Sequence, residues 1–181
     1  MSRAGLKRAV VMVVLRSADA LLLIRRGKQP NLGKYVPVGG HVDPFESPRD
    51  AAIREVEEET GCHLADVQFR GVLVETSPID YNWVVFVYSA EVKRIEPPAC
   101  PEGVLEWVDF SRVASLPTPA ADMHLYQLIL RGQPFVLNAV YDGELNLLCL
   151  EDELSGQVFH SVDARPLEGR APLAPAGQDH G

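Results

Sequence analysis

The chain is poor in cysteine, with Cys62, Cys100 and Cys149 as the three in a sequence of 181 residues. An odd number of widely spaced cysteines fits neither a disulfide framework nor a structural zinc site. Cytosolic proteins keep their thiols reduced. We therefore expect free cysteines and a cytoplasmic location.

The chain also lacks a long apolar run. A helix needs about 20 predominantly apolar residues to span a bilayer, and no segment approaches that length. The N-terminus does place basic residues before the run VVMVVL, an order that signal peptides share. That run is short and leads into Arg16, and the next run, LLLI, leads into Arg25 and Arg26, so the two strands of a hairpin explain the pattern better. We expect no membrane partner.

Positive charge is in the minority: 17 lysines and arginines stand against 25 aspartates and glutamates, for a net charge of −8. Proteins that bind nucleic acid through its phosphates usually carry a basic face, so we expect no nucleic-acid partner. A small anionic substrate held through a metal ion is compatible with this charge. The length suits one domain with a real core, either as a monomer or as a homodimer.

The pattern of apolar residues predicts more strands than helices. One helix is expected between Ser47 and Gly61, and a second over residues 122–131. Strands are expected over residues 9–15, 21–24, 35–38, 67–75, 83–92, 105–108, 134–141 and 145–150. Strands and helices do not alternate, which indicates an α+β fold with a mixed sheet. We assign residues 1–154 to this domain and residues 155–181 to a flexible C-terminal tail.

The first helix has clear boundaries. Ser47 is a good N-cap, Pro48 suits the first helical position and Gly61 is a natural C-cap. At 100° per residue, the apolar positions face the core and a neighbouring arc holds three carboxylates. These carboxylates belong to Glu55, Glu58 and Glu59.

Two further residues belong to the same acidic cluster. Arg54 lies one turn before Glu58, at a spacing that allows an ion pair, and Glu46 can fold back toward the same side. One interpretation is a solvated acidic face with routine ion pairs. The other is a metal site, because clustered carboxylate oxygens suit Mg²⁺ or Mn²⁺ and these ions bridge substrate phosphates. The glycines at both ends of the stretch favour the metal site.

This stretch resembles the Nudix box, G-x5-E-x7-R-E-U-x-E-E-x-G-U, in which U is a bulky aliphatic residue. The residues that match its fixed positions are Gly40, Glu46, Arg54, Glu55, Val56, Glu58, Glu59 and Gly61. Cys62, a small hydrophobe, stands at the final aliphatic position. The strand order and the second helix extend the likeness over about residues 5 to 153. The resemblance implies the Nudix fold, a mixed β-sheet sandwiched between α-helices.

The resemblance also implies roles for the residues of the box. The family's metal ligands, for Mg²⁺ or Mn²⁺, match Glu55, Glu58 and Glu59, with Glu46 in a supporting position. Glu58 also belongs to the catalytic group, together with Arg54, which resembles the arginine that orients a helix carboxylate. Gly39 and Gly40 let the substrate-binding loop pass close to the helix.

Outside the box, the MutT-like subgroup of the family suggests further residues. Its members often carry a loop glutamate ahead of a Trp-containing strand, which can bind metal or act as general base. Glu102 occupies that place and is otherwise an exposed loop acid, with Glu106 as a weaker competitor. Basic residues at the end of the second strand contact phosphates in this subgroup, which points to Arg25 and Arg26. A solvated strand end is the alternative for both arginines.

The base pocket of the subgroup is matched less closely. In MutT-like 8-oxo-dGTP diphosphatases, an acidic residue just before the second helix reads the purine. Asp122 occupies that place, so it either reads a base or is the N-cap of the helix. Pro119 and Ala121 stand where the animal enzymes have a Trp and a second Asp. Aromatic residues that either stack on a base or belong to the core are Tyr81, Trp83 and Phe86.

The reaction implied is metal-dependent hydrolysis of a pyrophosphate bond in a nucleoside diphosphate linked to a group X. The MutT-like resemblance favours a nucleoside triphosphate, oxidised or ordinary, giving a nucleoside monophosphate and pyrophosphate. ADP-ribose, a nucleotide sugar and a dinucleoside polyphosphate are alternative substrates, and Pro78 lies about where ADP-ribose hydrolases often have a proline. A non-catalytic nucleotide sensor is a third reading, although such proteins typically lose box glutamates and this chain keeps them.

Overall fold

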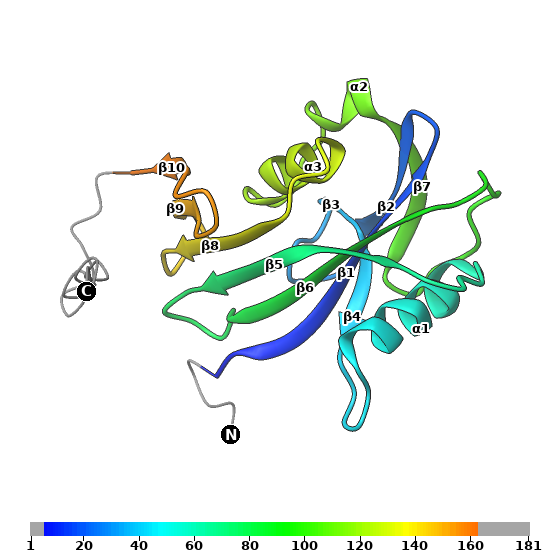
Figure 1. Cartoon of the computed structure of the whole chain (residues 1–181), viewed down its shortest axis with the longest axis horizontal. Coiled ribbons are helices and arrows are strands. Elements are labelled where there is room, and N and C mark those ends of the chain that lie inside the picture. The colour runs from blue at the N-terminus through cyan, green and yellow to red at the C-terminus, as the bar shows by residue number, and fades with distance from the viewer. Residues whose placement is uncertain (1–5, 163–181) are drawn as a thin grey trace, which may run out of the picture.

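The computed structural model describes residues 6–162 of the chain (Figure 1). Its elements in chain order are β1 (Arg8–Ser17), β2 (Ala20–Arg26), β3 (Tyr35–Val36), β4 (Val38–His41), α1 (Pro48–Thr60), β5 (Gln68–Thr76), β6 (Trp83–Glu91), β7 (Gly103–Asp109), α2 (Phe110–Val113), α3 (Asp122–Leu130), β8 (Phe135–Tyr141), β9 (Leu147–Asp152) and β10 (Val158–Ser161). The strands and helices expected from the sequence are all present, with boundaries shifted by a few residues. The structure adds the short helix α2 and the strand β10.

The described strands form one ten-stranded sheet in the order β10-β9-β8-β5-β6-β1-β2-β3, with β4 paired to β1 and β7 paired to β2. The pairs β1/β6 and β5/β8 are parallel, whereas the other pairs are antiparallel. This confirms the predicted mixed sheet and α+β class. The strand β10 extends the sheet beyond residue 154, where we placed the end of the domain. Residues 163–181 of the predicted tail lie outside the described residues.

Helices cover both faces of the sheet, and each face has its own hydrophobic core. The helix α3 packs over the first core, which includes Leu73, Leu125 and Leu137. The helix α1 packs over the second core, which includes Val13 and Val56. Figure 1 shows α1 and α3 on opposite sides of the sheet, which confirms the sandwich of a sheet between helices.

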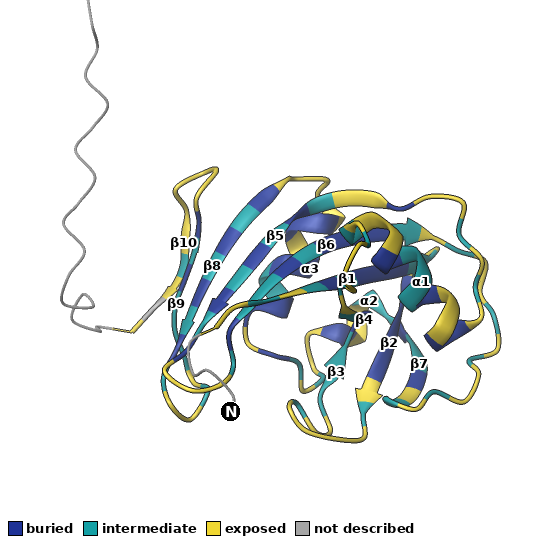
Figure 2. Cartoon of the chain, turned by 90° about the horizontal axis from the view of Figure 1, so that it is seen from below, coloured by how far each residue is buried: buried dark blue, intermediate teal, exposed yellow. Residues whose placement is uncertain are grey.

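The strands that are covered on both faces differ from those covered on one face. Residues 20–24 of β2 are all buried, because alternate side chains enter the two cores. In β8, buried positions alternate with partly exposed ones. Figure 2 shows this alternation as bands along β8, and it shows α1 with an exposed outer face.

The ends of α1 follow the sequence prediction. The Oγ of Ser47 accepts a hydrogen bond from the backbone N–H of Asp50 at 3.2 Å. Gly61 ends the helix with φ of 71°, a left-handed conformation that glycine adopts without strain. Because both ends are fixed, the acidic face of α1 is held at a constant position against β4.

Two further observations concern the cysteines and the length of the helices. All three cysteines are free thiols. No helix within residues 6–162 is long and apolar enough to cross a membrane.

Candidate active site

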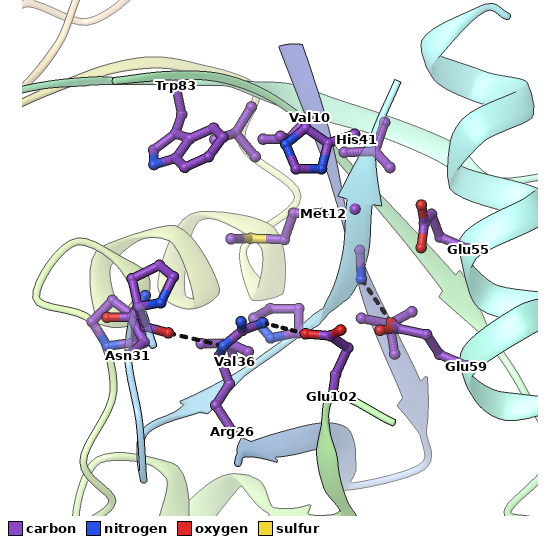
Figure 3. Close-up of a pocket in the computed structure, with 18 of the residues that line it drawn as sticks. Val10, Met12, Arg26, Asn31, Val36, His41, Glu55, Glu59, Trp83 and Glu102 are labelled. Atoms are coloured by element: carbon purple, nitrogen blue, oxygen red, sulfur yellow. Dashed lines mark hydrogen bonds and ion pairs between the residues drawn. The ribbon is translucent and has the colours of Figure 1, made fainter. Parts of the chain in front are cut away.

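A cavity of about 460 Å³ opens between α1, the strands β1, β4 and β6, and the loops before β3 and α3. Figure 3 shows Glu55 and Glu59 reaching it from α1 on one side, and Trp83 and Asn31 on the other. Its volume is in the range of a small-molecule site. We call the part near Glu55 and Glu59 the box end, and the part near Glu75, Tyr81 and Asp122 the inner end.

Arg54 is the hub of the box end. Its guanidinium donates to Glu46 through Nε at 2.8 Å and through Nη2 at 2.9 Å, so this pair is bidentate. The Nη1 group donates to Glu55 at 2.8 Å and to Glu58 at 3.2 Å. Glu46 therefore folds back as expected, and the predicted ion pair between Arg54 and Glu58 forms. The hydrogen bond from Arg54 lowers the pKa of Glu46.

The three helix glutamates differ in burial. The side chain of Glu58 is 60% exposed, whereas Glu59 is only 7% exposed and accepts a hydrogen bond from the Gly39 N–H at 3.1 Å. Burial raises the pKa of Glu59 to about 7, and burial also raises the pKa of Glu55. Carboxylates that are buried close together are costly to ionise. A cation placed among them would remove that cost.

The box end is not preassembled around an ion. Within residues 6–162, no three His, Cys, Asp or Glu side chains are arranged to hold a metal. Glu46, Glu55 and Glu58 point instead at Arg54. The donor set nevertheless fits a hard divalent cation, because it consists of carboxylate oxygens and two of them resist ionisation without a positive charge.

The two glycines before the box have different functions. A Cβ atom on Gly40 would collide with the carboxylate of Glu55, so only glycine leaves this carboxylate its position. A Cβ atom on Gly39 would collide with the backbone carbonyl of Val11 in the β1/β4 pair. Gly40 therefore shapes the site, and Gly39 allows strand pairing while its N–H orients Glu59.

Glu102 lies in the cavity wall beside Glu59, at the box end (Figure 3). It pairs with Arg26 at 3.2 Å and with Lys28 at 2.6 Å. The competing Glu106 lies outside the cavity lining and pairs with Arg25 at 3.4 Å. The structure thus brings Glu102 and Arg26 into the site and leaves Glu106 and Arg25 outside it.

The inner end contains two deeply buried acids. Asp122 is 2% exposed, and its Oδ2 has no hydrogen-bond partner among the described residues. Burial raises the pKa of Asp122 well above its usual value. The N-cap of α3 is Ala121, so the interpretation of Asp122 as the N-cap is wrong. Asp122 instead lies at the start of α3 as a buried residue of the cavity wall.

Glu75 is the second buried acid, and sequence reasoning missed it. It is 7% exposed, and its Oε1 accepts hydrogen bonds from Tyr81 at 3.2 Å and Tyr141 at 3.0 Å. Burial raises its pKa. A signal was present in the sequence, because Glu75 shares the inward strand parity of the buried Leu73.

The aromatic residues divide between the site and the core. Trp83 and Tyr81 line the cavity, whereas Phe86 packs in the core beneath α1. His41 also lines the cavity and meets Trp83 edge to face, with ring centroids 5.8 Å apart. Trp83 therefore presents a ring to the cavity near the inner end.

Comparison with known proteins identifies the family of the domain. A family model for the NUDIX domain matches residues 5–129. The uncharacterized Nudix hydrolase YvcI of Bacillus subtilis is 30% identical over 145 residues, which cover 77% of this chain and 90% of that protein. A human m7GpppN-mRNA hydrolase is 45% identical over 67 residues, which cover 34% of this chain and 20% of that protein.

Solved structures agree with the sequence comparison. A mutator MutT protein from Bacillus halodurans superimposes with a TM-score of 0.72 at 25% identity, covering 81% of this chain and 98% of that chain. The chain therefore belongs to the NUDIX domain family and is a MutT-like Nudix hydrolase.

Proposed function

We propose that this hydrolase cleaves a nucleoside triphosphate, ordinary or oxidised, into a nucleoside monophosphate and pyrophosphate. The observation that carries the proposal is the layout of one cavity, with carboxylates at the box end, cationic side chains beside Glu102, and a buried polar end with Trp83. In this proposal the phosphates of the triphosphate lie at the box end and its base enters the inner end. The coarser activity, hydrolysis of a nucleoside diphosphate-X compound, belongs to the family.

At the box end, Glu55, Glu58 and Glu59 would hold Mg²⁺ or Mn²⁺, with Glu46 and Arg54 as positioning residues. The ion would neutralise charge on the phosphate oxygens. Arg54 keeps Glu46 and Glu55 at fixed positions through hydrogen bonds of 2.8 and 2.9 Å. Residues that orient metal ligands contribute to metal affinity although they do not touch the ion.

Beside Glu59 in the cavity wall, Glu102 is the proposed general base. A base must reach the attacking water while cations bind the phosphates. Arg26 and Lys28 meet both needs, because they hold Glu102 at 3.2 and 2.6 Å and line the cavity themselves. Arg25 takes no part in this proposal, since its partner is Glu106 outside the cavity.

At the inner end, Asp122 is the proposed base-reading residue, and Trp83 provides a ring on which a base can stack. Both residues line the cavity. A buried Oδ2 without a hydrogen-bond partner is costly unless a ligand satisfies it. A bound base that donates a hydrogen bond to Asp122 would remove this cost.

The experiment is a substrate panel with the purified full chain in Mg²⁺ and in Mn²⁺. The panel contains GTP, dGTP, 8-oxo-dGTP, ATP, ADP-ribose, a nucleotide sugar, a dinucleoside tetraphosphate and a methylated cap dinucleotide. We expect monophosphate and pyrophosphate from a triphosphate, with the highest kcat/KM in the panel. A higher kcat/KM for any other compound would reject the triphosphate, and binding without hydrolysis of any compound would indicate a nucleotide sensor.

The cap dinucleotide is the second candidate substrate. The observation that favours it is the 45% identity to a human m7GpppN-mRNA hydrolase over 67 residues. The ADP-ribose alternative receives less support, because Pro78 is exposed and does not line the cavity.

A further inference from the structure

Glu75 is a buried carboxyl group in the wall of the cavity that the proposed chemistry does not use. It is 7% exposed and lies on β5, at the inner end and away from the box glutamates. A buried acid with no cationic partner is costly to keep. Lys7 comes near, but its Nζ donates to the backbone oxygen of Glu75 and to Thr76. No lysine or arginine of the described chain pairs with the Glu75 carboxylate itself.

The hydrogen bonds of Glu75 leave one of its oxygens available. The hydroxyls of Tyr81 and Tyr141 both donate to Oε1, at 3.2 and 3.0 Å. No described residue donates a hydrogen bond to the second oxygen of Glu75, Oε2. Tyr141 lies in the hydrophobic core and holds the carboxyl group from behind, whereas Tyr81 belongs to the cavity wall. The result is a carboxyl group with a fixed direction and a free acceptor.

A second free oxygen belongs to the same end of the cavity. The Oδ2 of Asp122 is buried without a hydrogen bond of standard geometry, although the Tyr126 hydroxyl lies close to this carboxyl group. Burial raises the pKa of Asp122, and Glu75 is close enough to raise it further. Two carboxyl groups that face a common buried space are costly to ionise together in the absence of a ligand. A ligand with several N–H donors satisfies both groups, whereas a ligand with acceptors on the same edge leaves at least one group unsatisfied.

We propose that Glu75 is a specificity-determining residue which, together with Asp122, selects a base edge with adjacent N–H donors. Guanine presents N1–H and the N2 amino group side by side on one edge. Hypoxanthine lacks the N2 amino group, and adenine lacks both the N1–H and the N2 amino group. The proposal rests on the proposed function for the position of the phosphates, and it names the class of base that the same cavity takes.

The test compares GTP with ITP, which differs from GTP only by the missing N2 amino group. We expect the wild-type protein to favour GTP about tenfold or more in kcat/KM, since paired hydrogen bonds to a base edge discriminate to this extent. In Glu75→Gln, an amide N–H₂ replaces one acceptor, so we expect the preference to fall to about threefold or less through KM, with kcat little changed. Glu144→Gln, at an exposed turn position between β8 and β9, is the control and should keep the wild-type ratio.

Three results would overturn the proposal. They are equal kcat/KM for GTP and ITP in the wild-type protein, an unchanged preference in folded Glu75→Gln, and a loss of the preference in Glu144→Gln as well. If Glu75→Gln does not fold, Tyr141→Phe carries the test, because it removes one of the two donors that orient Glu75 while keeping the carboxyl group. An unchanged GTP preference in that variant would then reject the role of Glu75.

Failure of the proposed function gives a different result. In that case no triphosphate is hydrolysed, and calorimetric titration of the wild-type protein with GMP and with IMP replaces the kinetic ratio. Tighter binding of GMP, by about tenfold and lost in Glu75→Gln, supports the inference independently of catalysis. Equal affinities for GMP and IMP reject it.

Discussion

The two ends of the cavity both contain acidic side chains, but these side chains have different hydrogen-bond donors. At the box end, Arg54 binds Glu46, Glu55 and Glu58 and lowers the pKa of Glu46. At the inner end, the donors to the Glu75 carboxylate among the described residues are two tyrosine hydroxyls, and the buried Oδ2 of Asp122 has no hydrogen bond of standard geometry. A guanidinium stabilises carboxylates in the charged form that a metal requires. At Glu75, burial disfavours the charged form and both donors are neutral hydroxyls, and we propose that this group selects a base by hydrogen bonding.

The largest expected effect tests the box end. Glu58→Gln keeps the shape of the side chain but removes the negative charge, so we expect hydrolysis in Mg²⁺ to fall by about 10²- to 10⁴-fold. The control is Glu57→Gln, one position away on the exposed side of α1, where Glu57 pairs with His63 at 3.1 Å. Full turnover by Glu58→Gln would show that this glutamate has no part in the chemistry.

The next prediction concerns the hub of the box end. Lysine cannot reproduce the bidentate pair of Arg54 with Glu46, so Arg54→Lys should raise the Mg²⁺ concentration needed for half-maximal activity by about 10- to 100-fold. Arg49→Lys is the matched control on the same helix, because Arg49 pairs with the exposed Asp66 outside the cavity. An equal loss in both variants would mean that the effect comes from the helix and not from the metal ligands.

The inner end is tested through stability against pH. The pKa of Asp122 is raised by burial, so the folded chain keeps a proton that the unfolded chain releases above pH about 4. The free energy of unfolding therefore decreases as pH rises above that value, by up to about 1.4 kcal/mol per pH unit, until the folded group also ionises. Asp122→Asn should lose this contribution and become more stable than the wild type at pH 8.

The measurement is the thermal midpoint of metal-free protein between pH 5 and pH 8. Asp142→Asn is the control with the opposite sign, because hydrogen bonds from Asn146 lower the pKa of Asp142. The stability from Asp142 is present above its unfolded pKa and is lost only as pH falls through the lower folded pKa. This control should therefore leave the slope between pH 5 and pH 8 unchanged. The same slope in Asp122→Asn and wild type would contradict a proton held by Asp122.

The smallest effect is expected at Lys28, the partner of Glu102. Lys28 is 56% exposed, and pairs of this kind are worth about 1 kcal/mol or less. Lys28→Met should therefore raise KM by about fivefold or less while leaving kcat near its wild-type value, as measured by steady-state kinetics. A large fall in kcat would instead show that Lys28 orients Glu102 for catalysis.

The sequence located the box end better than the inner end, for a physical reason. Helical spacing is a local property, so the arc of Glu55, Glu58 and Glu59 and the caps Ser47 and Gly61 could be predicted before the fold. The choice between Glu102 and Glu106 was not local, because both residues lie near the Trp-containing strand. The pairing of β2 with β7 separates them, since it places Glu102 beside Arg26 and Lys28 in the cavity wall.

What the sequence determined by itself was the reaction class, because the spacing of the Nudix box encodes one face of one helix. What only the tertiary structure decided was the character of the inner end. Glu75 and Asp122 are 47 positions apart in the numbering, and each looks ordinary in its own segment. Burial and the tyrosines around Glu75 come from β5, β6, β8 and α3 packing together. Such long-range packing brings two common acids to one buried end of the cavity, where we propose that they distinguish one base from another.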